Sequence, residues 1–216
     1  YTVAAPELDE YGDLDGDDMK DGAADFKTTP TNFSVIKLVR EVDEFGESFE
    51  FEVNGQKVWA RGANWIPDHS FPSVITKTRL RDRLTKAKDM GFNMLRIWGG
   101  GFYESDEFYD ICDELGIMVW QDFPFGCAYY PDTDEWLEII RVEAAANIKR
   151  LRNHPCLALW CGNNENEEMA YAKWGDPARH PDRYFGENLY NDVLPAVLAE
   201  LDPKRSYIRT SPIGNA

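Results

Sequence analysis

Five short apolar segments that alternate with amphipathic segments predict an α/β fold, which we interpret as about five β/α units of a partial TIM (β/α)8 barrel preceded by a short β segment. The connections are short, so the strands should be parallel and joined by right-handed crossovers. Polar side chains stand where the expected strands end: Asn64, Arg96, Asp122, Asn164 and Glu165. Strand ends that converge on one site are typical of a barrel. An open doubly wound sheet is the alternative, but no Gly-x-Gly-x-x-Gly follows a strand, so nucleotide binding lacks support.

Composition and pattern divide the chain into three regions. Residues 1–32 are acidic and poorly periodic, which predicts a linker or surface loop. We interpret residues 33–60 as a β-strand and hairpin segment, because 33–40 reads as a strand and alternating segments flank Asn54-Gly55, a strong hairpin signal. Residues 61–216 are interpreted as the N-terminal five units of the barrel.

Hydrophobic periodicity and local stop signals place the elements of the barrel. Strands are expected at residues 62–67, 92–98, 117–123, 156–161 and 206–210. Helices are expected at residues 76–90, 106–115, 134–152 and 186–201. Gly91 and Gly116 end the first two helices, and Ser105 is suited to cap the second. Asp202-Pro203 breaks the last helix.

The charge of the chain limits its partners. The net charge is −16 and the sequence pI is near 4.5, which argues against nucleic acid or an anionic membrane and favours a neutral ligand. No apolar stretch is long enough to span a bilayer. The first residues show no basic start followed by an apolar core, so no signal peptide is visible. These observations leave the compartment open.

The cysteines do not form a recognisable metal motif. Cys112, Cys127, Cys156 and Cys161 include no Cys-x-x-Cys pair and have no cluster of histidines nearby, so a zinc site is not expected. Cys156 and Cys161 lie at opposite ends of one expected strand, too far apart to form a disulfide. We interpret all four as buried thiols and expect neither a metal nor a cofactor.

The segment after the strand at residues 156–161 carries the strongest functional signal. The apolar run ends directly in Gly162-Asn163-Asn164-Glu165-Asn166-Glu167-Glu168. An uncharged apolar run predicts a strand buried on both faces, and its carboxyl end is where a barrel places its chemistry. Helix capping is the structural alternative, with Asn163 or Asn164 as the cap and the acids in the first helical turn.

Four segments stand in order on successive expected strand ends: RGANWIP at 61–67, LRIWGGG at 95–101, CDELGIMVWQDF at 112–123 and WCGNNENE at 160–167. Together they resemble the catalytic barrel of family 2 glycoside hydrolases, and of the β-mannosidases in particular. The exo-glucosaminidases of that family tend to carry Asp where this chain has Glu165, which favours the mannosidase branch.

The resemblance implies a retaining exo-hydrolase that releases terminal β-mannosyl residues. Glu165 matches the general acid/base of the family, Asn164 matches the residue that hydrogen-bonds the sugar 2-hydroxyl, and Arg96 matches the arginine that holds the nucleophile. The candidates for sugar binding are Trp98, Trp65, Asn64, Asp122 and Trp174. Some of these have structural alternatives, because Trp65 and Trp98 also suit a core and Asp122 also suits a buried partner of Arg96.

The nucleophile of the family is a Glu on the seventh barrel strand, whereas the expected strands here stop at the fifth. We therefore assign no nucleophile. An open five-strand barrel exposes a sheet edge and an apolar inner face, so we expect the rest of its own polypeptide or a complementing chain as partner, besides a β-mannoside oligosaccharide as substrate. The alternatives are a non-catalytic glycan-binding or assembly fragment and a family relative that acts on a β-glucosaminide, galactoside or glucuronide.

Overall fold

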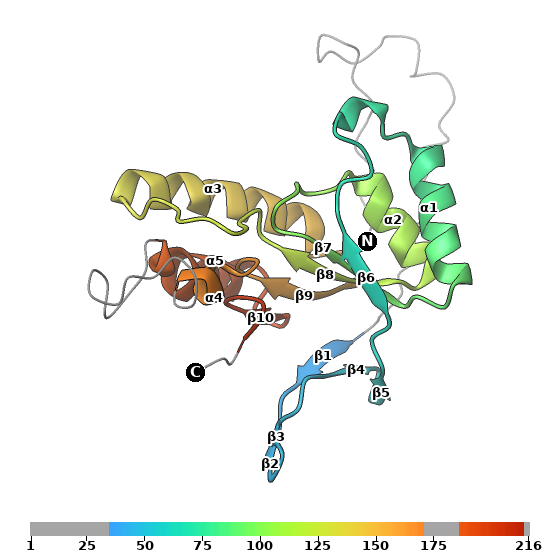
Figure 1. Cartoon of the computed structure of the whole chain (residues 1–216), viewed down its shortest axis with the longest axis horizontal. Coiled ribbons are helices and arrows are strands. Elements are labelled where there is room, and N and C mark those ends of the chain that lie inside the picture. Colours follow the sequence, from blue (N-terminus) through green and yellow to red (C-terminus); the bar gives the residue numbers. More distant parts are fainter. Residues whose placement is uncertain (1–34, 171–185, 214–216) are drawn as a thin grey trace, which may run out of the picture. The chain divides into compact units, whose positions relative to one another are not determined.

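The computed structural model describes residues 35–170 and 186–213 (Figure 1). The chain divides into two compact units, residues 1–33 and 34–216, and the described residues belong to the second. The acidic region expected at residues 1–32 lies outside the described part.

A five-stranded parallel sheet with helices confirms the α/β barrel class. The strands are β6 (Gly62–Trp65), β7 (Met94–Ile97), β8 (Met118–Asp122), β9 (Leu157–Cys161) and β10 (Ser206–Ile208). They lie in chain order, β10-β9-β8-β7-β6, and every neighbouring pair is parallel. Sequential parallel order is the arrangement of a (β/α)8 barrel.

Local sequence signals explain where the long helices begin and end. The helices are α1 (Lys77–Asp89), α2 (Asp106–Leu115) and α3 (Asp134–Leu151). Thr76 and Thr133 cap α1 and α3, because each hydroxyl oxygen accepts a hydrogen bond from a first-turn N–H. Gly116 ends α2 with φ 65°, a left-handed conformation that favours glycine.

The last expected helix is interrupted. Among the described residues of this region, a π-helical turn, η3 (Leu189–Val193), precedes α5 (Leu194–Leu201). The N–H of Leu194 donates to the carbonyl of Leu189, five residues earlier. Pro195 follows and has no N–H to donate, so the α-helical ladder is already broken here. A short helix, α4 (Asn166–Glu168), follows β9.

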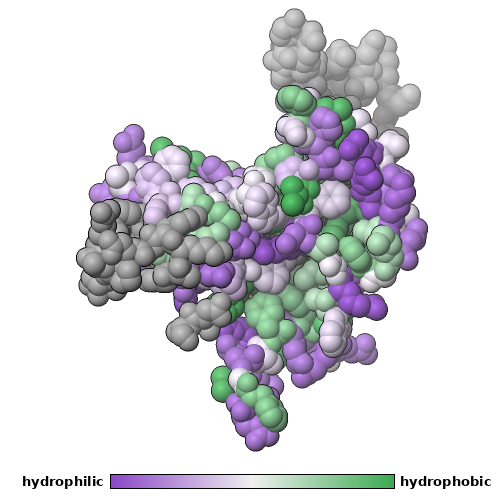
Figure 2. All heavy atoms as spheres, in the orientation of Figure 1, coloured by the Kyte–Doolittle hydropathy of each residue, from purple (hydrophilic) through white to green (hydrophobic). Residues whose placement is uncertain are grey.

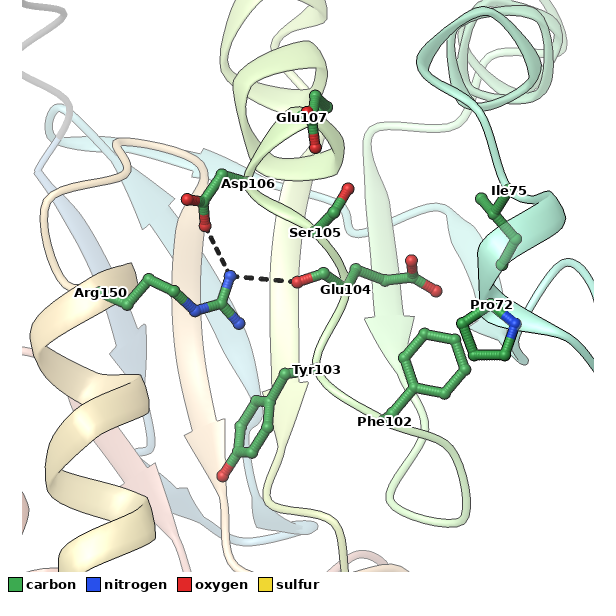
Figure 3. A pocket seen from close by; sticks show the side chains of 9 residues that line it. All are labelled: Pro72, Ile75, Phe102, Tyr103, Glu104, Ser105, Asp106, Glu107 and Arg150. Carbon is green, nitrogen blue, oxygen red and sulfur yellow. Dashed lines mark hydrogen bonds and ion pairs between the residues drawn. The ribbon is translucent and has the colours of Figure 1, made fainter. Parts of the chain in front are cut away.

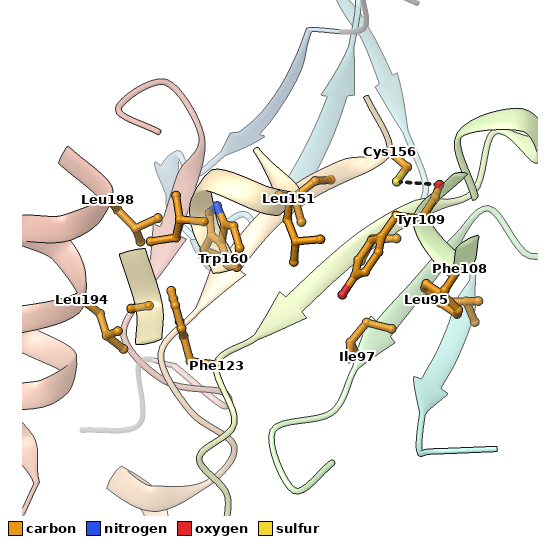
Figure 4. Packing of buried hydrophobic residues seen from close by; sticks show 14 of the residues in the cluster. Leu95, Ile97, Phe108, Tyr109, Phe123, Leu151, Cys156, Trp160, Leu194 and Leu198 are labelled. Carbon is orange, nitrogen blue, oxygen red and sulfur yellow. Dashed lines mark hydrogen bonds between the residues drawn. The ribbon is translucent and has the colours of Figure 1, made fainter. Parts of the chain in front are cut away.

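The main core lies between the sheet and the helices. Side chains from both layers interdigitate there, including Leu95, Phe108, Leu151, Trp160 and Leu194 (Figure 4). Aromatic rings stack within it, with the Phe123 and Trp160 centroids 5.1 Å apart. The burial of this helix-facing side of the sheet supplies most of the apolar contact of the fold.

A second, smaller core covers the opposite, inner face of the sheet. It is built by the antiparallel sheet β1 (Ile36–Val39), β4 (Glu50–Val53) and β5 (Gln56–Val58), while β2 (Val42–Asp43) and β3 (Gly46–Glu47) form a separate hairpin. Phe51 of β4 clusters with Met94 and Met118, at the amino ends of β7 and β8. The expected exposure of the apolar inner face does not extend to this end of the barrel, because the small sheet covers it.

The exposed surface differs between α1 and the edge strand β6. The outer side of α1 is rich in charged residues and is hydrophilic in Figure 2. In the described part, β6 pairs only with β7, and its residues Gly62, Ala63 and Asn64 are exposed. Among the described helices, none has the length and apolar character needed to cross a membrane.

Candidate active site

An ion pair between neighbouring strand ends forms the centre of the site. Arg96 lies on β7, and its Nε and Nη2 both donate to the carboxylate of Asp122 at the end of β8, at 3.1 Å and 2.7 Å. The side chain of Asp122 is 0% exposed and that of Arg96 is 15% exposed. The two-nitrogen geometry fixes the plane of the guanidinium group. This burial follows the second interpretation of Asp122, as the partner of Arg96.

Further donors surround the carboxylate of Asp122. Its oxygens also accept hydrogen bonds from the backbone N–H of Gly99 at 3.0 Å and from Nε1 of Trp120 at 2.9 Å. The Trp120 ring lies under the guanidinium carbon of Arg96 at 5.3 Å, a cation–π contact. Burial raises the pKa of Asp122, and the bonds from Arg96 and Gly99 offset part of that rise. Trp120 is not among the residues that the sequence predicts for the site, because its pattern indicates only a strand position.

The two asparagines after β9 have separate tasks. Asn163 is fully buried, and its Oδ1 accepts a hydrogen bond from the N–H of Asn166, the first residue of α4, at 3.0 Å. The Oδ1 of Asn164 instead accepts a hydrogen bond from Nη2 of Arg96, at 3.1 Å. The expectation that Asn163 or Asn164 is the helix cap is wrong in position, because Glu165 occupies the N-cap of α4 and makes no side-chain capping bond.

Backbone hydrogen bonds join the segments that leave β8 and β9. The N–H of Asn164 donates to the carbonyl of Phe125 at 2.9 Å, and the N–H of Cys127 donates to the carbonyl of Asn164 at 3.0 Å. On the other side, the N–H of Glu165 donates to the carbonyl of Ser211 at 2.8 Å. Glu165 is thus held between the exits of β8 and β10.

Glu165 has an uncommon backbone conformation and a half-buried side chain. Its φ is 62° and that of Cys127 is 48°, left-handed values that are rare outside glycine. The thiol of Cys127 donates to Oε2 of Glu165 at 3.5 Å. The prediction that all four cysteines are buried is wrong for Cys127, which is only half-buried because it lies in the loop after β8 beside Glu165. No periodic pattern in that loop predicts the contact between Cys127 and Glu165.

Trp98 and Asn64 lie near the same end of the sheet. Trp98 follows β7 two residues after Arg96, a spacing that places both side chains on one face of an extended chain. Its half-buried ring packs on Gly100, where an added Cβ would stand 2.0 Å from the ring. Asn64 is aligned with Arg96 in the β6–β7 register and is exposed.

Trp65 is turned away from this cluster. It packs against Phe108 of α2, with ring centroids 5.0 Å apart, and its Nε1 donates to Oε1 of Glu104 at 2.9 Å. Successive residues of a strand face opposite sides of the sheet. Because Trp65 directly follows Asn64, its side chain lies on the other face, toward the helices. The core interpretation fits Trp65 better than a sugar platform. Trp174 lies outside the described residues.

A cavity of about 550 Å³ lies at the amino end of α2, and Glu104 is one of the residues that line it (Figure 3). Arg150 of α3 lines this cavity and donates to the Glu104 carbonyl and to the Asp106 carboxylate. Burial raises the pKa of Glu104, and the bond from Trp65 lowers it in part. The residues of the Arg96 cluster do not line this cavity.

One group of potential metal ligands occurs among the described residues: Asp113, His154 and Cys156. Their polar atoms already bond one another. The two oxygens of Asp113 contact Nδ1 of His154 and the backbone N–H of Cys156, each at 2.7 Å. Burial raises the pKa of the Cys156 thiol well above its usual range, which keeps it protonated. The group ties the turn before β9 to α2.

The cluster at the strand ends therefore combines three chemical capacities. Arg96 offers a fixed cation, Asn164 offers an amide beside it, and Glu165 offers a half-buried carboxyl group at the exit of β9. Such a set can hold an anionic or hydroxylated group and transfer a proton to it.

Comparison with protein-family models matches residues 47–206 to the TIM barrel domain of glycosyl hydrolases family 2. Among curated proteins, the β-mannosidase of Bos taurus is 40% identical over 202 residues, which cover 91% of this chain and 23% of the relative. The β-mannosidase B of Aspergillus clavatus is 38% identical over 187 residues, covering 83% of this chain and 22% of the relative.

Solved structures give the same picture. The crystal structure of β-D-mannosidase from Dictyoglomus thermophilum is 51% identical, with a TM-score of 0.81, and the match covers 84% of this chain and 22% of that one. The apo structure of Bacteroides uniformis β-glucuronidase 3 is 25% identical, with a TM-score of 0.61, and the match covers 81% and 20%. The chain thus spans between a fifth and a quarter of the length of these relatives.

Proposed function

Because the chain belongs to family 2 of the glycosyl hydrolases, we propose that it carries the acid/base half of the active site of a retaining, exo-acting β-mannosidase. The observation that carries the proposal is the placement of Glu165 at the exit of β9, next to an amide bonded to Arg96. The higher identity to β-mannosidases than to the β-glucuronidase supports β-mannoside as the substrate.

In the proposed reaction, Glu165 acts twice. As a carboxylic acid it protonates the departing glycosidic oxygen, while a second carboxylate attacks the sugar and forms a covalent intermediate. As a carboxylate it then takes a proton from the water that hydrolyses this intermediate. In retaining enzymes the two carboxyl groups lie about 5 Å apart. The second carboxylate is supplied from outside the five described strands.

Arg96 and Asn164 organise the space between the two carboxyl groups. Asp122 fixes the plane of the Arg96 guanidinium group, and the N–H donors that Asp122 does not use hold the nucleophile in this proposal. The amide of Asn164 binds the 2-hydroxyl of the sugar. A hydrogen bond at that position strengthens as the sugar approaches its transition state.

The sugar-binding wall is proposed from the neighbouring residues. Trp98 offers an apolar ring on the same side of the extended chain as Arg96. Asn64 offers an amide from β6, next to Arg96 in the strand register. Asp122 contributes through Arg96, because its own carboxylate is fully buried. Trp65 packs against Phe108 and bonds Glu104, away from this wall, and Trp174 remains a candidate from the sequence alone.

The proposal includes a structural partner. The exposed residues of β6 and its single neighbour in the described sheet leave a strand edge that a closed barrel would pair. We infer that the remaining strands come from the same polypeptide or from a complementing chain, as the coverage of the relatives suggests.

The test is Glu165→Ala in the longest natural polypeptide that contains this chain. Turnover of β-mannosides with poor leaving groups should fall by about 10²–10⁴-fold, the usual contribution of acid/base catalysis. Aryl β-mannosides with good leaving groups need no proton and should lose much less, and added azide should restore turnover.

Glu167→Ala is the matched control, because Glu167 lies two residues away and is ion-paired with Arg209 at 2.7 Å. It should leave the leaving-group dependence unchanged. An equal loss on both substrate types in Glu165→Ala would reject the acid role. A wild-type protein that binds β-mannosides without hydrolysing them would instead support the glycan-binding alternative.

A further inference from the structure

The sulfur of Cys127 lies between two residues of the proposed site. It accepts a hydrogen bond from Nδ2 of Asn164 at 3.3 Å and donates one to Oε2 of Glu165 at 3.5 Å. A thiol is both a weak donor and a weak acceptor, so one sulfur atom can serve both neighbours. Cys127 therefore connects the amide and the carboxyl group that the proposed reaction uses.

The amide of Asn164 has only one workable orientation in this setting. Its Oδ1 accepts from Nη2 of Arg96, and arginine has no acceptor, so this end of the amide must be the oxygen. The NH2 group consequently faces Cys127 and gives one N–H to the sulfur. Because the amide group is planar, this bond also fixes the direction of the second N–H of Asn164.

The backbone holds Cys127 in this position at a cost. A non-glycine residue in the left-handed region is strained, and the conformation persists only where neighbouring contacts maintain it. Here the N–H of Cys127 donates to the carbonyl of Asn164, and its partner Glu165 is left-handed as well. The two strained residues meet through their side chains.

The other cysteines have a different environment. Cys112, Cys156 and Cys161 are buried in the cores, where burial raises the pKa of each thiol well above its usual range. They act there as small apolar side chains. Cys127 alone among the four is half-buried and contacts two polar side chains of the strand-end cluster.

We propose that Cys127 is a positioning residue, which fixes the amide of Asn164 on the sugar 2-hydroxyl and the carboxyl of Glu165 on the departing oxygen. This inference rests on the proposed function. By orienting the Asn164 amide, the thiol of Cys127 contributes to the recognition of the hydroxyl group at position 2 of the sugar.

The first test measures the contact without any activity. Iodoacetamide labelling of Cys127, quantified by mass spectrometry in the full polypeptide, should be about threefold faster in Glu165→Ala than in the wild type, because the truncation removes the oxygen that accepts the thiol hydrogen bond and covers the sulfur. Glu167→Ala truncates a carboxylate two residues away that does not contact Cys127, and it should leave the rate unchanged. Equal rates in the two variants would overturn the proposal.

The second test separates positioning from a structural role. With good aryl leaving groups, which need no proton from Glu165, Cys127→Ala should lower kcat/KM for the β-mannoside about tenfold, mainly through kcat, and lower it for the 2-deoxy analogue by no more than about twofold. Cys127→Ser keeps a donor and an acceptor and should lie between. Cys112→Ala, a core thiol, should leave the ratio of the two substrates unchanged. Equal losses on both substrates in Cys127→Ala would make Cys127 merely structural and overturn the proposal.

Asn164→Ala, measured alongside, distinguishes the two levels of inference. If it abolishes the preference for the 2-hydroxyl while Cys127→Ala does not, the positioning role alone is overturned. If Asn164→Ala leaves the preference intact, the assignment of Asn164 in the proposed function fails, and the positioning role fails with it.

Discussion

The inner face of the parallel sheet carries apolar side chains at its amino end and charged side chains at its carboxyl end. At the amino end of β7, Met94 clusters with Met118 and with Phe51 of the small sheet. Two residues further along the same strand and on the same face, Arg96 forms a buried ion pair with Asp122. One strand thus passes from an apolar contact to a charged one within a single side-chain repeat.

The difference teaches how this fold separates stability from chemistry. Apolar packing is non-directional and favourable wherever area is buried, so the amino end can secure the small sheet without fixing any group precisely in angle. Buried charges are costly unless every donor and acceptor is matched, but once matched they fix orientation. The carboxyl end has that property, and the proposed reaction depends on it.

The most disruptive way to break the comparison is Arg96→Met. It leaves the Asp122 carboxylate buried without its cation, which should lower the free energy of unfolding by about 3–5 kcal/mol and abolish turnover. Urea unfolding followed by tryptophan fluorescence measures the loss. The control is Arg81→Met, at an exposed ion pair with Glu114, which should cost under about 1 kcal/mol. Similar losses in both variants would contradict the view of the carboxyl end as a matched charge cluster.

Phe51→Ala tests the apolar end. Removing a buried aromatic ring should cost about 3 kcal/mol, because it leaves a cavity beside Met94 and Met118. Turnover per folded molecule should stay within about twofold of the wild type, since Phe51 lies at the other end of the strands. A large loss of kcat at full folding would show that the two ends are coupled.

Asn163→Ala sharpens the comparison inside the carboxyl end. Its amide bonds the N–H of Asn166, the hydroxyl of Thr210 and the carbonyl of Arg209, all within 3.0 Å. Truncation leaves buried partners unsatisfied and should cost about 1–3 kcal/mol in thermal or urea unfolding. Asn191→Ala, which removes an exposed bond to Glu187, serves as control and should be nearly neutral.

The smallest effect concerns pH. Burial raises the pKa of Glu104, so its contribution to stability is complete below the unfolded pKa and is lost as pH rises through the folded pKa. Glu104→Gln should therefore gain stability relative to the wild type as pH rises above the ordinary glutamate pKa of about 4.3. Glu107, whose pKa is lowered mainly by a bond from Ser105, should show the opposite sign in Glu107→Gln. Melting temperatures across this range decide it, and parallel curves would contradict both signs.

The order of strands and helices could be read from the sequence because its signals are local. Thr76 caps a helix and Gly116 ends one through interactions within a few residues. The polar strand ends followed from the same reasoning, since the parallel order brings Arg96, Asp122 and Asn164 to one edge. Fold class and the outline of the candidate site are thus consequences of periodicity.

What the sequence did not indicate depends on contacts distant along the chain. The thiol of Cys127 meets Glu165 across 38 residues, and nothing in its own loop signals that meeting. Trp120 looks like any strand residue until its indole reaches Asp122 and its ring covers Arg96. The π-helical turn before Pro195 arises from a missing donor whose structural outcome depends on packing.

The small sheet that covers the amino end of the barrel also precedes the first barrel strand in the chain. During translation, β1, β4 and β5 therefore leave the ribosome before any strand that they will shield. When Met94 and Met118 are synthesised, the residues that cover them in the folded protein have therefore already been made. Their apolar side chains need not wait for a later part of the chain to be covered, and exposed apolar surface is what makes partly folded chains prone to aggregate.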